Sequence, residues 1–180
     1  MLSLVVRGAI ALAVLNMTIA LQGKLSEKTA QANIFNLTNT VSRIMADEMK
    51  MAGYNVSPPY FTVAKPESIE FTYVNPSLGT QRWVKYLKGD SLELISTPNP
   101  NDRRLYRCDS TSPGIGVRKV VANGIVKLDF LYYDSLGNTT STITSIKSFS
   151  VHIVMATGEV VNGFYPAGEW TYRFFPSNIN

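Results

Sequence analysis

The sequence predicts an α+β fold in which one long N-terminal helix packs against an antiparallel β-sheet. Three observations support this prediction. Residues 2–21 are almost all apolar, residues 34–52 repeat apolar side chains at spacings of three and four, and the rest of the chain changes to a spacing of two. A helix and a sheet that each have one apolar face can bury these faces against each other, which gives the two layers of an α+β domain.

The helix begins in a segment that is suited to a membrane. Residues 1–21 carry only one charge, on Arg7, and roughly 20 apolar residues are enough to cross the hydrocarbon layer as a helix. The charged residues that follow come without a site typical of signal-peptide cleavage, and a buried core helix would not be apolar on all sides. We therefore expect a retained transmembrane half over residues 1–22 and a globular domain over residues 23–180. The expected membrane anchor consists of Leu4, Val5, Ile10, Leu12, Val14, Leu15, Ile19 and Leu21.

The second half of the helix is amphipathic. Apolar side chains follow one face of it, while asparagine and charged residues occupy the others, so this half is expected to cover a sheet. Gly23 costs a helix about 1 kcal/mol relative to alanine, which is too little to force a break. We expect one helix from residue 2 to about residue 53, ended by Gly53 in the left-handed conformation. The side chains expected to pack on the sheet are Ile34, Leu37, Val41, Ile44, Met45 and Met49.

Beyond Pro58 and Pro59 the chain alternates apolar and polar side chains, which is typical of strands with one buried face. The predicted strands lie within residues 68–74, 81–97 (two strands around a turn at 88–90), 103–109, 124–134, 145–157, 159–165 and 169–175. Their short connections predict an antiparallel sheet. We expect Arg103, Arg104 and Arg107 to keep an edge strand of this sheet soluble.

The sequence contains no motif for catalysis, and none for a metal ion or a cofactor. His152, the only histidine, has no serine, cysteine or aspartate at a motif spacing and is expected to be a packed or half-exposed strand residue. Asp134 is expected to bond its own turn, and Cys108, the only cysteine, has no internal disulfide partner. A net charge of +4 without a basic cluster gives little support to nucleic-acid binding. We therefore predict a protein that is not an enzyme and has no small-molecule substrate.

Several short segments resemble one known family. The predicted helix closes with "DEMKMAGY" (residues 47–54), which is similar to an acidic-x-x-basic-Met-Ala-Gly-Tyr signature. The segments that follow in the family's order are "SIEFTYV" (68–74), "LYR" (105–107), "IVKLDFLYYDSLGN" (125–138) and "YRFFPSNIN" (172–180). Together with an apolar helix that continues into an amphipathic one, they resemble the type IV pilin-like family. Within it, the chain is similar to minor pilins and type II secretion minor pseudopilins of the J or W class, over nearly its whole length.

The resemblance also locates a possible processing region, formed by Met1, Leu2, Ser3 and Val6. The family's processing site is a glycine followed by Phe-Thr/Ser-Leu-Ile/Val-Glu. The chain matches this pattern from Ser3 to Val5 but has Met1 in place of the glycine and Val6 in place of the glutamate. In the family, the glutamate neutralises a neighbour's amino terminus inside the apolar filament core. The resemblance with Val6 therefore implies a subunit at a filament tip, or one that packs without this contact.

The resemblance implies a minor pilin or pseudopilin that helps to initiate, cap or assemble a type IV pilus or a type II secretion pseudopilus. Its expected partners are other pilin-like subunits and the inner membrane. A single pass through that membrane would leave the globular domain in the periplasm or, in the assembled filament, outside the cell. The alternative is a membrane-tethered extracytoplasmic binding domain or adhesin that acts alone.

Overall fold

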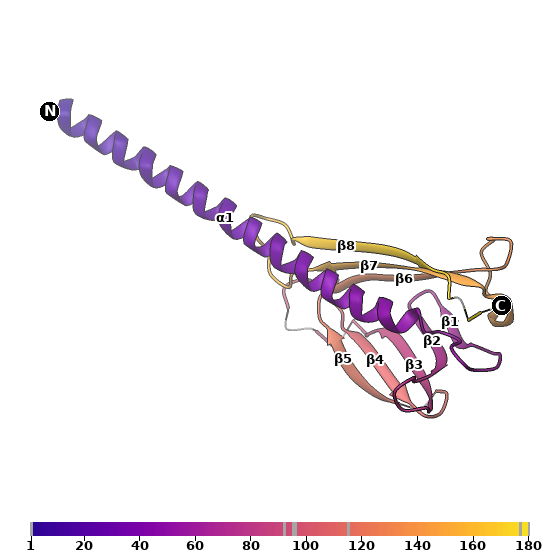
Figure 1. Ribbon diagram of the computed structural model, residues 1–180. Helices are drawn as coiled ribbons and strands as arrows, with labels where there is room; N and C mark the ends of the chain where they lie inside the picture. Colours follow the sequence, from indigo (N-terminus) through magenta and orange to yellow (C-terminus); the bar gives the residue numbers. More distant parts are fainter. Residues whose placement is uncertain (1, 92, 95–96, 115, 177, 180) are drawn as a thin grey trace.

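The computed structural model describes the backbone of residues 2–91, 93–94, 97–114, 116–176 and 178–179, and their side chains from residue 12 onward. The chain forms one long helix, α1 (Leu2–Met49), beside two antiparallel sheets (Figure 1). Sheet A contains, in this order, β1 (Phe61–Lys65), β2 (Ser68–Val74), β3 (Gln81–Lys88), β4 (Leu105–Ser110) and β5 (Val117–Ala122). Sheet B contains β6 (Ile125–Tyr133), β7 (Ser148–Ala156) and β8 (Ala167–Phe174), with a short 3-10 turn, η1 (Ile143–Ser145), between β6 and β7. The α+β prediction is confirmed, with two sheets in place of the single one expected.

The helix α1 is continuous. It runs through Gly23 without a break, and its 48 residues give a length of about 72 Å at about 1.5 Å per residue. The helix ends at Met49, four residues before the predicted end, because the turns that follow are tighter. Gly53 has the expected left-handed conformation, with φ of 77°. Its N–H group donates to the carbonyl of Thr72 on β2 at 2.9 Å, so the turn after the helix is bonded directly to sheet A.

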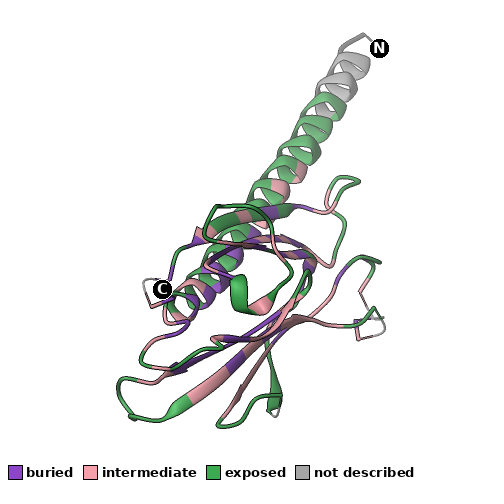
Figure 2. Ribbon diagram, turned by 90° about the vertical axis from the view of Figure 1, so that its right-hand side faces the viewer, coloured by how far each residue is buried: buried purple, intermediate pink, exposed green. Residues whose placement is uncertain are grey.

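The N-terminal half of α1 projects away from both sheets, and exposed residues surround its described part (Figures 1 and 2). We name residues 12–25 the projecting segment. Its large apolar side chains, each more than half exposed, are Leu12, Val14, Leu15, Met17, Ile19, Leu21 and Leu25. Within the part of the chain that the structure describes, no helix is apolar over a long enough stretch to cross a membrane. The predicted anchor residues Leu4, Val5 and Ile10 and the processing residues Met1, Leu2, Ser3 and Val6 lie outside the described side chains.

The C-terminal half of α1 packs on β7 and β8. Its buried face consists of Ile34, Thr38, Val41, Ser42, Met45 and Met49. The prediction is therefore confirmed for four side chains and wrong for Leu37 and Ile44, which are 42% and 45% exposed. At 3.6 residues per turn, these two lie about a quarter turn away from the centre of the buried face. The helix approaches β8 closely, since a Cβ atom on Gly168 would lie 2.6 Å from Oγ1 of Thr38.

The core lies between α1 and the inner faces of the two sheets. Phe61 on β1 and Phe149 on β7 meet edge to face, with ring centroids 5.7 Å apart, and so join sheet A to sheet B. The Tyr132 hydroxyl on β6 donates to the carbonyls of Lys65 and Ser68, at 3.0 and 3.1 Å. One apolar core is therefore shared by the helix and both sheets.

Six predicted strands are confirmed, as β2, β3, β4, β6, β7 and β8, and two are wrong. The described residues within 81–97 supply only β3, because β4 pairs with β3 on the side that a hairpin partner would have used. Residues 159–165 form only a bridge between Val161 and Phe164, since Asn162 and Gly163 adopt left-handed conformations that cannot extend a strand. The strands β1 and β5 were not predicted.

Candidate interaction surfaces

A charged cluster joins the last turn of α1 to sheet A. Glu48 accepts two hydrogen bonds from Nε of Arg107 on β4, at 2.9 and 3.0 Å, and one from its Nη2 at 2.6 Å. The Tyr86 hydroxyl on β3 donates to the same carboxylate at 2.5 Å. The side chains of Glu48 and Arg107 are only 23% and 19% exposed. Three hydrogen bonds in this fork geometry fix the direction in which the helix leaves the sheet.

The cluster continues along the sheet to Asp109 and Arg82. Arg107 also pairs with Asp109 at 3.1 Å, and Asp109 pairs with Arg82 at 2.5 Å, so positive and negative charges alternate. Burial alone would lower the pKa of Arg107, but the hydrogen bonds and negative charge of Glu48 raise that pKa above its usual value. Burial raises the pKa of Tyr86, and Glu48 raises it further. Arg107 and Tyr86 therefore keep their protons at neutral pH, which suits a mechanical link better than proton transfer.

This position corrects the interpretation of the arginines. The strand β4 lies between β3 and β5, so Arg107 does not protect an edge; it binds Glu48 inside the cluster. Arg103 precedes β4 and donates to the carbonyls of Pro100 and Asp102, at 2.9 and 2.7 Å. The segments "DEMKMAGY" and "LYR" contain Glu48 and Arg107, but no pattern in the sequence indicates that the two side chains meet.

The remaining candidates have ordinary surroundings. His152 on β7 is partly exposed, as expected, and its Nε2 lies 2.9 Å from a carboxylate oxygen of Glu169 on β8. Asp134 accepts hydrogen bonds from the N–H groups of Leu136 and Asn138, both at 2.9 Å, so it does bond its own turn. Cys108 is a free thiol of intermediate burial. Within the described part of the chain, no three histidine, cysteine, aspartate or glutamate side chains gather in a way that could hold a metal ion.

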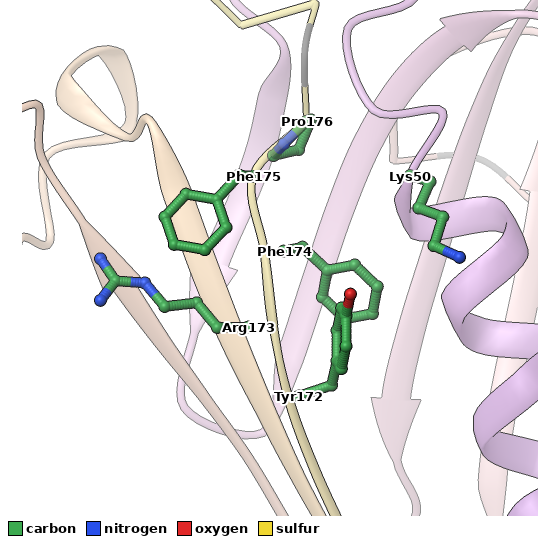
Figure 3. A pocket seen from close by; sticks show the side chains of 6 residues that line it. All are labelled: Lys50, Tyr172, Arg173, Phe174, Phe175 and Pro176. Carbon is green, nitrogen blue, oxygen red and sulfur yellow. The ribbon is translucent and has the colours of Figure 1, made fainter.

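A surface that the sequence did not indicate lies between α1 and β8. It has two hollows, of about 360 Å³ and about 240 Å³, and both contain Lys50 and Tyr172. Figure 3 shows Lys50 at the helix end on the same side of β8 as Tyr172 and Phe174, while Arg173 and Phe175 lie on the other side. We name this surface, formed by these residues with Arg43 and Trp170, the β8 groove. The alternation in "EWTYRFF" indicated a strand, but only the topology makes it an edge strand next to the helix.

Comparison with protein-family models, with curated proteins and with solved structures finds no match for the chain. Functional inference therefore rests on three structural features: the projecting segment, the charged cluster and the β8 groove.

The buried tyrosines predict a loss of stability at high pH. Burial raises the pKa of Tyr86, Tyr73 and Tyr132 above the ordinary value of about 10. Because the unfolded chain releases these protons more readily, the free energy of unfolding should fall as pH rises above about 10, by about 1.4 kcal/mol per pH unit for each such tyrosine. Urea unfolding at a series of values from about pH 8 to about pH 11 measures this slope.

The matched variant for this measurement is Tyr132→Phe, which removes one ionisable hydroxyl and keeps the ring. Above about pH 10, the free energy of unfolding of this variant should fall less steeply than that of the wild type, by about 1.4 kcal/mol per pH unit. Tyr172→Phe serves as the control, because the Tyr172 side chain is 48% exposed. Identical slopes in the wild type and in Tyr132→Phe would contradict the raised pKa of Tyr132.

Proposed function

We propose that this chain is a minor pilin-like subunit that helps to initiate, cap or assemble a type IV pilus or a type II secretion pseudopilus. One observation carries the proposal: the exposed apolar side chains of the projecting segment belong to the same continuous helix whose other half forms a wall of the core. A large exposed apolar surface on a protein usually meets lipid or another protein. The order of "DEMKMAGY" and the later segments supports the same proposal.

In this proposal the helix has two successive environments. Before assembly, its N-terminal half lies in the inner membrane as a single pass, and the two sheets lie in the periplasm. During assembly, the same side chains pack against the helices of other pilin-like subunits. Lipid chains are about as apolar as leucine, so this exchange costs little free energy, and close packing between helices then favours the filament.

The charged cluster suits such a role because a filament subunit must move as one body. Force applied to the projecting segment reaches the sheets through the buried face of α1 and through the bonds between Glu48 and Arg107. Both links lie in the second half of the helix. The residues before Gly23, whose carbonyl accepts a hydrogen bond from Asn162 at 3.2 Å, can therefore contact other molecules without loosening the core.

The β8 groove favours a second candidate, a membrane-tethered binding domain or adhesin that acts alone. Such a protein would use the helix only as an anchor, so its projecting segment would contact lipid and no other pilin-like helix. Gene deletion separates the two candidates in the organism that carries the chain. A filament subunit predicts a strong loss of pili or of secreted protein, whereas unchanged piliation and secretion would contradict the filament role.

Cross-linking tests the helix contact itself. In a chain carrying Cys108→Ser, we would introduce Leu21→Cys into the projecting segment and treat cells with a short thiol cross-linker. Single-cysteine libraries of the candidate partner subunits' helices supply the second thiol. The proposal predicts a product that contains this chain and a second pilin-like subunit.

The control for this experiment is Leu136→Cys, which places an exposed thiol in the turn after β6, on the globular domain. It should react with a monofunctional maleimide as readily as Leu21→Cys but give no product with partner helices. Equal yields from both positions, or none from Leu21→Cys in cells that assemble filaments, would contradict the proposal.

A further inference from the structure

The strand β8 has a free edge that could accept another strand. It pairs with β7 alone, over eight residues without a register irregularity and without a proline. Proteins usually protect edge strands with prolines, bulges or charged side chains. The edge strand β5 follows this rule: it carries Arg118 and Lys119, and its pairing with β4 is irregular. The two charged side chains of β8 instead form hydrogen bonds within sheet B, Glu169 with His152 and Arg173 with Ser148.

Aromatic side chains accompany this edge. The side of β8 that faces α1 carries a row of three rings, from Trp170, Tyr172 and Phe174. The ring centroids of Trp170 and Tyr172, which are stacked, lie 5.9 Å apart, and those of Tyr172 and Phe174 lie 4.8 Å apart. Tyr172 is 48% exposed, and Phe175 at the end of the strand is 69% exposed. Both border the larger hollow of the β8 groove (Figure 3). Aromatic residues stabilise strand pairs through contacts with the neighbouring strand, which here is absent on one side.

The charges around the groove indicate what the added strand should carry. Arg43 on α1 and Lys50, directly after the helix, reach its hollows, and neither forms an ion pair with a described residue. Asp47 lies between them in the sequence and is also exposed without such a pair. The helix side of the groove therefore keeps one positive charge in excess, and Arg173 adds a second from β8. A strand with acidic side chains toward the helix would be complementary to this surface.

We propose that the β8 edge binds an extended acidic segment of another protein by strand addition. Main-chain hydrogen bonds to β8 supply affinity, and alternate side chains enter the groove. The glutamate or aspartate side chains of the segment face Arg43 and Lys50, and its apolar side chains contact Phe175. The edge strand β5 of a second copy fits less well, because pairing it with β8 would bring Arg118 and Lys119 toward these same positive charges. This inference uses a surface that the filament proposal does not need and holds whether or not the helix assembles.

The test uses the full chain in detergent and a synthetic peptide as long as β8 that alternates glutamate with valine. Titration calorimetry measures the affinity, and hydrogen exchange measures the protection of the β8 amides. We expect binding together with slower exchange along β8. Charge reversal at both cations, Arg43→Glu with Lys50→Glu, should weaken binding by about tenfold or more. The matched control is Lys28→Glu, an exposed lysine of the same helix outside the groove, which should leave the affinity unchanged.

Two further peptides make the result decisive. A peptide with N-methylated backbone should lose binding, because it cannot form the ladder of hydrogen bonds, and a peptide with lysine in place of glutamate should bind much more weakly. Equal binding of the N-methylated peptide would overturn strand addition, and equal binding of the lysine peptide would overturn the acidic preference. Failure of the glutamate peptide to bind would overturn the whole inference. Circular dichroism melting of each variant confirms that the fold is intact.

Discussion

Replacement of Met45 by alanine is expected to lower the free energy of unfolding by about 2–5 kcal/mol. The Met45 side chain is fully buried between α1 and the sheets, so its removal loses apolar contacts and leaves a cavity. The neighbouring replacement, Ile44→Ala, should cost less than about 1 kcal/mol, because Ile44 is on the exposed side of the helix. Urea unfolding of both variants, followed by circular dichroism, gives the two values under the same conditions.

Ile44→Ala is the internal control because both changes place alanine in the same helical turn. The gain in helix propensity is below about 0.7 kcal/mol for either replacement, which is small beside the difference expected between the two variants. Similar losses for the two variants, or a larger loss for Ile44→Ala, would mean that α1 presents a different face to β7 and β8.

The same pair of residues explains how far the sequence could predict the helix. Apolar spacing correctly located Ile34, Val41, Met45 and Met49 in the core, because a long stretch of regular helix keeps these positions in line. It could not anticipate that Thr38 is buried in preference to Leu37. A small side chain is required where the helix approaches Gly168, and the Thr38 hydroxyl can be buried because it donates to the carbonyl of Ile34 at 2.8 Å.

The sheets were predictable strand by strand but not as an arrangement. A spacing of two predicts that a segment is extended and which side chains share a face, but it contains no information about the neighbouring strand. Residues 89–104 separate β3 from β4 in the sequence, and only the fold brings the two strands together. The division into two sheets, and with it the free edge of β8, depends on such long-range pairing.

The candidate surfaces were predictable to different degrees. The exposed apolar side chains from Leu12 to Leu21 are where the sequence predicts an anchor, but their membrane location stays a prediction. Glu48 and Arg107 are 59 residues apart in the chain and meet only after folding. The β8 groove combines residues from α1 with the last strand, so no local pattern could have indicated it.

The charged cluster leads to the second large effect, the replacement Glu48→Ala. It should lower the free energy of unfolding by about 2–3 kcal/mol, because it leaves the partly buried Arg107 without the carboxylate that binds it and Tyr86 without an acceptor. Asp47→Ala is the matched control, since Asp47 is the preceding acidic residue, is exposed and forms no ion pair with a described residue. It should change the free energy by less than about 0.5 kcal/mol.

A double-mutant cycle then separates the link between helix and sheet from the cost of an unpaired charge. Arg107→Met removes the other partner, and the combined variant with Glu48→Ala should be more stable than the sum of the two single losses predicts, by about 1–3 kcal/mol. The reason is that each single variant takes the nearest opposite charge from Glu48 or Arg107, whereas the combined variant removes both charges. Asp109 keeps its ion pair with Arg82 in every variant. Additive losses would mean that the contact contributes no coupling, and α1 would then be held to the domain by the buried face around Met45 alone.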